Sequence, residues 1–183
     1  MIPEGISYFP EVILPATEAE LLALFQQLDL AEVKVHGRRA KRKMKCFGWD
    51  YNSSRKAVSL APPIPDYLRA LLERCCERCG YVADEFAQAI VTWYPPGYGI
   101  GPHADAESFG NTVFGVSLGT TTKMLFRRGD EQFTQILERR ALLVMTGQSR
   151  WEWTHEIEGR HVKETRWSVT YRSVQASAKP QNG

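Results

Sequence analysis

The chain has 183 residues, with 23 lysines and arginines against 21 aspartates and glutamates, so its formal net charge is +2. This length suits one domain, and 43% hydrophobic with 24% charged residues excludes a mostly disordered, collagen-like or coiled-coil protein. No apolar run approaches the ~20 residues that span a bilayer, and the first residues lack a signal-peptide pattern. We therefore expect one cytoplasmic domain over residues 1–183 with no membrane segment, and leave its oligomeric state open.

Two amphipathic helices are predicted in the first half of the chain. Thr17 and Glu20 have the spacing of a capping box and predict the start of the first helix. Its apolar stripe consists of Leu21, Leu24, Phe25 and Leu28. Residues 66–79 carry a second apolar stripe that ends at Gly80, which predicts the second helix.

The four cysteines are predicted to be free thiols that fill the core. Cys75, Cys76 and Cys79 lie in the second predicted helix, and Cys46 lies elsewhere. A zinc cluster needs a second ligand pair at matching spacing, which one remaining cysteine does not supply. We therefore expect neither a zinc site nor a disulfide framework.

A strongly basic segment lies between the two predicted helices. Its seven positive charges fall within twelve residues: Lys34, Arg38, Arg39, Lys41, Arg42, Lys43 and Lys45. Subtracting these seven charges from +2 leaves −5 for the rest of the chain, so the positive potential is local and favours an anionic partner. Phe47, Trp49 and Tyr51 follow, and interleaved cations and flat rings are typical of nucleic-acid sites. A half-buried strand with a solvated basic face is an equally open interpretation.

After the second helix the pattern changes to short β-prone runs. Seven strands are predicted, at 89–94, 113–118, 123–127, 133–137, 141–146, 151–157 and 165–172. No helices are interleaved, so we expect an α+β, mainly β fold, in which antiparallel sheets form a sandwich or jelly roll. The polar tail at 175–183 is expected to be loose.

Three side chains that could bind one metal occur late in the chain. His103 and Asp105 are two residues apart, and an extended chain would send both side chains to the same side. His155 ends a strand-like run that could return it to this pair. Two imidazoles and one carboxylate leave several coordination positions open, which is the facial arrangement of non-haem Fe(II) oxygenases.

The last predicted strand has two chemically different faces. A period of two places Arg166, Ser168, Thr170 and Arg172 on one face, and Trp167, Val169 and Tyr171 on the other. Two inward arginines are costly to bury unless an anion meets them, and guanidinium groups bind carboxylates in a bidentate manner. This face therefore suits a dicarboxylate, although arginines exposed on an edge strand are the alternative.

Together these residues resemble the AlkB-like Fe(II)- and 2-oxoglutarate-dependent dioxygenases. The resemblance covers about residues 91–174, with weaker similarity back to about residue 39. It depends on an ordered set of residues: Tyr94, His103-x-Asp105, His155 and Arg166-x5-Arg172. It implies a double-stranded β-helix (jelly-roll) core with the two N-terminal helices packed on it.

The resemblance also implies which residues bind the metal and the cosubstrate. Fe(II) would be bound by His103, Asp105 and His155. The 2-oxoglutarate would chelate that iron and place its far carboxylate on Arg166. The remaining cosubstrate contacts would come from Tyr94, Arg172, Thr92 and Ser168, and the family often has asparagine at the last two positions.

The implied activity is an oxidation. Members of the family use O2 to convert 2-oxoglutarate to succinate and CO2 while a C–H bond of the substrate is oxidised, and an oxidised N-methyl group leaves as formaldehyde. We therefore expect oxidative demethylation of N-alkylated bases in DNA or RNA, as in alkylation repair. Residues 31–56 would form a substrate lid, with substrate contacts from Phe47, Trp49, Tyr51, Arg39, Lys41, Arg42 and Lys43. Two alternatives are the same iron chemistry on a tRNA base, protein or small molecule, and a non-catalytic jelly roll that binds nucleic acid.

Overall fold

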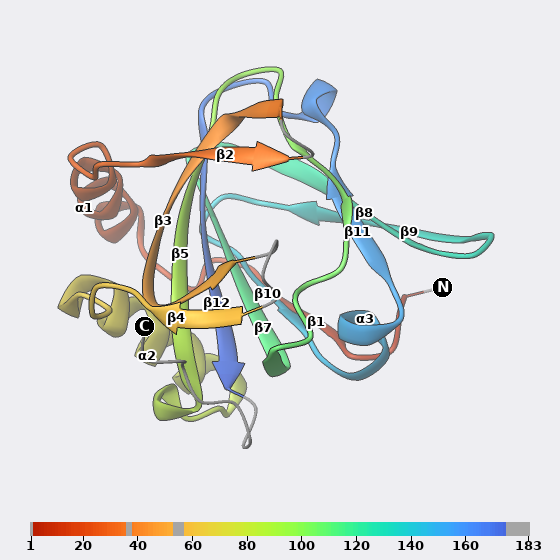
Figure 1. Ribbon diagram of the computed structural model, residues 1–183, viewed down its shortest axis with the longest axis horizontal. Helices are drawn as coiled ribbons and strands as arrows, with labels where there is room; N and C mark the ends of the chain where they lie inside the picture. Colours follow the sequence, from red (N-terminus) through yellow and green to blue (C-terminus); the bar gives the residue numbers. More distant parts are fainter. Residues whose placement is uncertain (1, 36–37, 53–56, 175–183) are drawn as a thin grey trace.

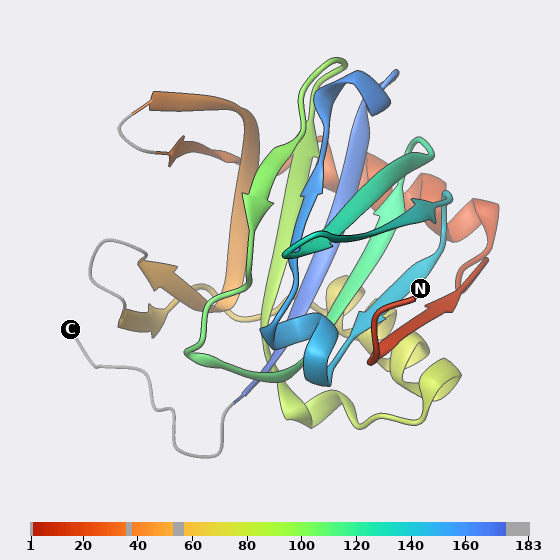
Figure 2. The same cartoon turned by 90° about the vertical axis from the view of Figure 1, so that its right-hand side faces the viewer.

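The computed structural model describes residues 2–35, 38–52 and 57–174, and the expected loose tail at 175–183 lies outside this part. Two antiparallel sheets lie against each other, and α1 (Pro15–Phe25) and α2 (Asp66–Cys79) cover the outer face of the larger sheet (Figures 1 and 2). This arrangement confirms the mainly β jelly roll with two N-terminal helices that the sequence predicts. None of the helices within the described ranges has both the length and the apolar character of a bilayer span.

The strands of the larger sheet are β1 (Ile6–Phe9), β2 (Ala31–Val35), β3 (Arg38–Asn52), β4 (Ala57–Leu60), β5 (Phe86–Tyr94), β7 (Phe109–Leu118), β10 (Leu142–Met145) and β12 (Arg166–Val174). They are ordered β1-β10-β7-β12-β5-β3-β2, with β4 paired to β3. The smaller sheet contains β6 (Ile100–His103), β8 (Thr122–Arg128), β9 (Glu131–Leu137) and β11 (Thr154–Ile157), in the order β6-β11-β8-β9. A short helix, α3 (Gly147–Trp151), and 3-10 turns at Ala83–Glu85 and Gly159–His161 complete the elements.

The main hydrophobic core lies between the larger sheet and the two N-terminal helices. Three residues of β12, Trp167, Val169 and Tyr171, point into it, as the period of two predicts. The Phe25 ring of α1 lies 5.6 Å from the Trp167 ring, and the Tyr171 hydroxyl donates a hydrogen bond of 2.7 Å to the Leu68 carbonyl of α2. Both helices are therefore fixed to the central strand of the sheet.

Two of the four cysteines have the core-filling role that the sequence predicts. Cys75 and Cys76 are buried in the core between α2 and the sheet, whereas Cys79 is half-buried against that core and Cys46 is half-buried elsewhere; all four thiols are free. Burial raises the pKa of the Cys75 and Cys76 thiols, so they are neutral near pH 7 and pack as small apolar groups.

Two local expectations are wrong. The first helix begins at Pro15 with Leu14 as its N-cap, so Thr17 lies inside the first turn and caps nothing; proline at the first helical position determines this start. The run predicted as one strand at 151–157 is divided, because a capping box of Thr146 and Ser149 starts α3 and leaves only the second half of the run for β11.

Most of the basic segment lies in strand β3. It pairs with β5 from Lys43 to Gly48 and then leaves the sheet to pair with β4. Gly48 has a φ of +74°, and a side chain there would meet the Ala87 carbonyl oxygen at 2.0 Å. Six of the seven basic residues thus lie in β3 and Lys34 lies in β2, which agrees with the strand of the second interpretation above, and Gly48 interrupts the alternation of β3 after the last of them.

The carboxylate of Glu18 is buried, and hydrogen-bond donors surround it. Glu18 of α1 is 1% exposed, accepts the Gly119 N–H at 2.9 Å, and is bonded to Arg139 at 2.8 Å and to Arg140 at 3.3 Å. Burial alone raises the pKa of Glu18, but these donors outweigh it and lower the pKa below its ordinary value. Glu18 therefore joins α1 to the turn after β7 as a carboxylate.

Candidate metal and cosubstrate site

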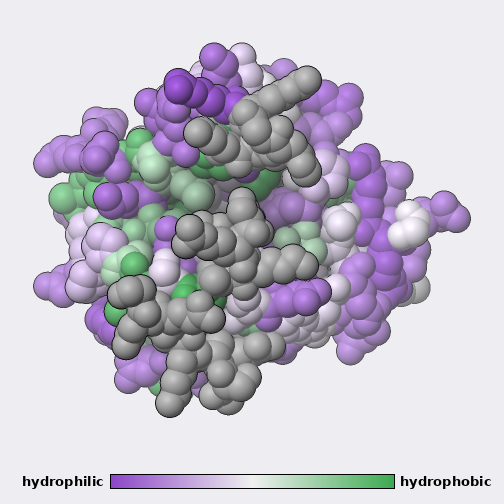
Figure 3. Space-filling view, in the orientation of Figure 1, coloured by the Kyte–Doolittle hydropathy of each residue, from purple (hydrophilic) through white to green (hydrophobic). Residues whose placement is uncertain are grey.

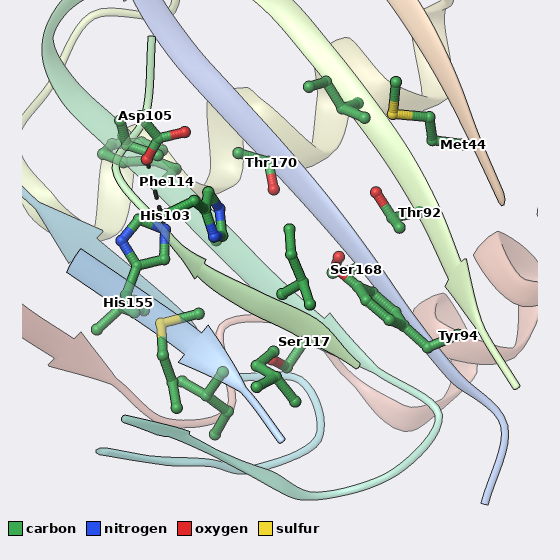
Figure 4. A pocket seen from close by; sticks show the side chains of 18 of the residues that line it. Met44, Thr92, Tyr94, His103, Asp105, Phe114, Ser117, His155, Ser168 and Thr170 are labelled. Carbon is green, nitrogen blue, oxygen red and sulfur yellow. Dashed lines mark ion pairs between the residues drawn. The ribbon is translucent and has the colours of Figure 1, made fainter. Parts of the chain in front are cut away.

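The two sheets enclose a pocket of about 190 Å³, seen from close by in Figure 4. Its lining includes the residues expected to bind the metal and the cosubstrate: His103, Asp105, His155, Thr92, Tyr94, Arg166, Ser168 and Arg172. They come from β5, β6, β11, β12 and the loop after β6. In contrast to this interior, the edge of the molecule where β8 and β9 project is mainly hydrophilic (Figure 3).

The expected metal ligands lie next to one another at one end of the pocket. His103 and His155 are direct partners in the β6–β11 ladder, and their ring centroids are 4.4 Å apart. Asp105 follows β6, with its Oδ2 atom 3.7 Å from His155 Nε2, the pair joined by the dashed line in Figure 4. His103 Nδ1 lies 2.9 Å from the Gly101 carbonyl oxygen, and donation of its proton there leaves Nε2 free for a metal.

The protonation states of two of these groups also suit a metal. Burial lowers the pKa of His155 to about 4, so its imidazole is neutral near pH 7. Burial alone raises the pKa of Asp105, but Arg172, followed by His155, outweighs it and keeps the pKa well below its usual range. A neutral imidazole and a carboxylate are the forms in which these side chains bind divalent cations, so the donor set fits Fe(II).

The carboxylate of Asp105 is at the same time bound by Arg172. Arg172 Nε donates to Asp105 Oδ1 at 2.7 Å, and Arg172 Nη2 donates to the same oxygen. Among the described residues, no group of three or more histidine, cysteine, aspartate or glutamate side chains is placed so that it could hold a metal ion as it stands. Metal binding at the two histidines and Asp105 therefore requires side-chain adjustment within this cluster.

Two further buried side chains hold this cluster, and neither was predicted from the sequence. Gln88 of β5 accepts a hydrogen bond from Arg172 Nη1 at 2.7 Å and donates one to the Trp49 carbonyl at 2.8 Å. Arg150 of α3 donates to the main-chain carbonyls of Asp105 at 3.0 Å and Ala106 at 2.6 Å. A period of two along β5 could have found Gln88, which shares a face with Thr92, whereas no local pattern distinguishes Arg150.

The opposite part of the pocket contains a buried arginine with unused donors. Arg166 is 3% exposed, and its Nη2 donates to Ser117 Oγ at 3.2 Å. Its Nε and Nη1 atoms are buried without a hydrogen-bond partner among the described residues. Its guanidinium carbon lies 4.9 Å from the Tyr94 ring centroid. Because buried charged donors are normally satisfied, these two nitrogens fit an incoming carboxylate such as that of 2-oxoglutarate.

The residues expected to bind substrate are divided between two faces of β3. Arg42 and Met44 line the pocket, whereas Lys43 lies in a hollow on the other face with Trp93 and Trp167. Lys41 belongs to that other face by alternation and is exposed. Arg39 is also exposed, and its Nε lies 3.3 Å from a carboxylate oxygen of Glu32.

The three aromatic residues expected near the substrate are likewise divided. Phe47 is 6% exposed and belongs to the core beneath the helices, so its expected contact with the substrate is wrong. Trp49 and Tyr51 lie beside Phe109, with ring centroids 6.4 Å and 6.3 Å from it. Gly48 separates Phe47 from these two rings, and Phe109 beside them lies under Arg172, with its ring centroid 5.4 Å from the guanidinium carbon. Neither Trp49 nor Tyr51 is among the residues that line the pocket.

Comparison with known proteins identifies the family. The family model described as "2OG-Fe(II) oxygenase superfamily" matches residues 5–172. The chain is 32% identical to the tRNA (carboxymethyluridine(34)-5-O)-methyltransferase ALKBH8 of Mus musculus over 87% of this chain, but it spans only 25% of that relative's length. It is 34% identical to the uncharacterized protein L905 of Acanthamoeba polyphaga mimivirus, over 93% of this chain and 85% of that protein.

Solved structures agree on the fold. "The structure of OsALKBH1" superposes with a TM-score of 0.71 at 16% identity, over 94% of this chain and 98% of that one. A Pseudomonas putida prolyl-4-hydroxylase superposes with a TM-score of 0.65 at 15% identity, over 93% of both chains. The chain thus belongs to the 2OG-Fe(II) oxygenase superfamily as an AlkB-like, 2-oxoglutarate-dependent dioxygenase that uses Fe(II), 2-oxoglutarate and O2.

Proposed function

We propose that His103, Asp105 and His155 hold Fe(II), that Arg166 binds the far carboxylate of 2-oxoglutarate, and that the enzyme oxidises a modified base in DNA or RNA. The observation that supports this proposal best is the position of the two groups. One pocket is lined by two imidazoles and a carboxylate that lie together and, apart from them, by a buried guanidinium with two nitrogens that have no hydrogen-bond partner among the described residues. A dicarboxylate that binds metal at one end and a cation at the other suits this arrangement.

The protein contributes binding, orientation and protonation state. When bound, Fe(II) with 2-oxoglutarate and O2 supplies the oxidising power for a C–H bond. His155 offers a neutral nitrogen, while Arg172 and Arg150 fix Asp105 through its side chain and main chain respectively. Apolar side chains of the pocket would surround the reacting groups, and they include Met44, Ile90, Val113, Leu143 and Ile157.

Nucleic acid is the substrate class favoured by charge and by similarity. Strand β3 carries Arg42 toward the pocket and exposed Arg39, Lys41 and Lys43 on its other face, close enough together to contact successive phosphates. One relative is named as a tRNA methyltransferase, and an Arabidopsis thaliana relative at 24% identity is named "Alkylated DNA repair protein ALKBH8 homolog". On this proposal, loss of an N-methyl group and stable hydroxylation of a base are the two products to distinguish.

The proposal is tested by measuring succinate and formaldehyde released with Fe(II), 2-oxoglutarate and a panel of methylated DNA and RNA oligonucleotides. We expect at least one oligonucleotide to stimulate succinate release above the unmodified control. Its affinity should fall with salt, with a slope of about 0.7 in log affinity per log salt for each phosphate contact of a single strand. Succinate release that only proteins or small molecules stimulate would reject the nucleic-acid substrate while leaving the dioxygenase chemistry in place.

A further inference from the structure

We infer that the pocket selects an electrically neutral or anionic base, with carbonyl oxygens facing Arg42, and rejects bases that carry a positive charge through methylation. This inference depends on the proposed function for the substrate being a base, and it adds the charge class of that base. The inference divides the expected N-alkylated bases into cationic bases, which the pocket would reject, and neutral bases, which it would accept. Methylation gives 1-methyladenine a positive charge near neutral pH, whereas 3-methyluracil stays neutral and keeps two carbonyl oxygens.

Positively charged side chains outnumber negatively charged ones among the described residues that line the pocket. Three guanidinium groups, those of Arg42, Arg166 and Arg172, face a single carboxylate, that of Asp105. Fe(II) and the dianion of 2-oxoglutarate carry equal and opposite charges, so loading the site leaves the excess of positive charge unchanged. A cationic base would therefore enter a positively charged, partly dehydrated pocket.

Asp105, the one acidic side chain among the described residues that line the pocket, is already engaged. Asp105 accepts two hydrogen bonds from Arg172 and lies 3.7 Å from His155, at the metal end of the pocket. Glu32, at the edge of the sheet, is paired with Arg39. Residues 36–37, 53–56 and 175–183, outside the described part, include no aspartate or glutamate that could supply a further carboxylate side chain.

Arg42 lines the pocket beside Met44, whose neighbour in the β3–β5 ladder is Thr92. Arg166 is the proposed partner of the cosubstrate, and Arg172 is bonded to Asp105. Among the described residues Arg42, by contrast, lines the pocket without an ion pair or a side-chain hydrogen bond. Its donors are therefore available to carbonyl or carboxylate oxygens of a bound base, whereas a cationic base would face like charge at close range.

The test compares two RNA oligonucleotides that are identical except for one central base, 1-methyladenine or 3-methyluracil. Binding is measured to protein loaded with Fe(II) and 2-oxoglutarate in the absence of oxygen, so the phosphate contribution cancels in the ratio of affinities. We expect the wild-type protein to bind the neutral base more tightly by roughly tenfold. Arg42→Glu should remove or reverse this preference.

Lys41→Glu is the matched control, because it makes the same charge change one residue away on the outward face of β3. It should weaken binding of both oligonucleotides by the same factor and leave their ratio unchanged. Arg42→Met separates loss of the cation from gain of an acid, and a melting curve checks folding. Equal or tighter binding of 1-methyladenine by the wild-type protein, or a ratio that Arg42→Glu does not change, would overturn the inference.

Failure of the proposed function gives a different result. If neither methylated oligonucleotide binds more tightly than an unmodified one, the base is not the substrate. The charge preference is then measured with benzoate and benzylammonium, two flat probes of opposite charge, at saturating 2-oxoglutarate. Tighter binding of benzoate that Arg42→Glu abolishes supports a pocket selective for anions, and tighter binding of benzylammonium by the wild-type protein refutes it.

Discussion

Both faces of β12 contain fully buried residues, but they differ in how their polar atoms are satisfied. On the helix side, Trp167, Val169 and Tyr171 are at most 6% exposed, and the Tyr171 hydroxyl has its partner in α2. On the pocket side, Arg166 is 3% exposed, and two of its nitrogens have no partner among the described residues. Burial alone therefore does not separate structure from function in this strand, whereas unsatisfied buried donors do.

A second pair of residues shows the same contrast for buried charges. Glu18 lies on the helix side and is bonded to Gly119, Arg139 and Arg140. Arg166 lies on the pocket side and is incompletely bonded. We expect removal of the satisfied charge to affect stability and removal of the incompletely bonded charge to affect cosubstrate binding. The predictions below test this division.

The largest effect is expected for Asp105→Ala on the pocket side. Loss of one of the proposed iron ligands should reduce succinate release to background, while the circular dichroism spectrum stays that of the folded protein. Iron affinity, measured separately with Fe(II) without oxygen, should fall as well. Wild-type decarboxylation in this variant would remove Asp105 from the metal site.

The next effect is expected for Arg166→Met. Charge-assisted hydrogen bonds contribute about 1.5–3 kcal/mol, so the apparent Kd for 2-oxoglutarate should rise roughly 10- to 150-fold. Without cosubstrate the variant should melt no lower than the wild type, because methionine replaces a buried, incompletely paired charge by an apolar group of similar length. An unchanged affinity for 2-oxoglutarate, or a large loss of stability, would place Arg166 with the structural residues.

The division of β12 into a helix side and a pocket side could be predicted in part from the sequence. The alternation from Arg166 to Arg172 predicted both faces of β12, because a strand buried between helices and a pocket keeps a strict period of two. The same reasoning failed at Phe47 and Trp49, because Gly48 adopts a positive φ and shifts the alternation between them. A glycine in a long strand signals such a break, but its direction depends on the strand that it leaves.

Contacts across the chain could not be predicted in this way. Arg150 reaches the carbonyls of Asp105 and Ala106 from a helix about 45 residues away, and only the folded chain brings them together. The helix itself was missed because its capping box, Thr146 and Ser149, lies beside an aromatic run that resembles a strand. The residues proposed to bind ligands could be named from their type, spacing and family resemblance, whereas the residues that would position them depend on tertiary geometry.

A smaller effect is expected for Tyr171→Phe on the helix side. The change removes one buried hydrogen bond to the Leu68 carbonyl and should lower the free energy of unfolding by about 1 kcal/mol. Chemical denaturation measures this loss. The affinity for 2-oxoglutarate should equal that of the wild type, although Tyr171 and Arg172 are adjacent in sequence. A changed cosubstrate affinity would show that the two faces of β12 are coupled.

The smallest effect near neutral pH is the contribution of Glu18 to the pH dependence of stability. Its pKa is lowered in the folded protein, so the unfolded chain binds a proton more readily in acid. Stability from Glu18 is therefore fully present above its ordinary pKa of 4.5 and is lost as the pH falls through the lowered folded value. Glu18→Gln should have a lower free energy of unfolding at pH 7, and that free energy should decline less steeply in acid, measured by unfolding at several pH values.

Glu20→Gln removes an exposed carboxylate from the same helix and is the matched control. If both variants decline in parallel with the wild type below pH 4.5, the bonds to Arg139 and Arg140 do not stabilise the charged form of Glu18, and the contrast with Arg166 fails on the helix side.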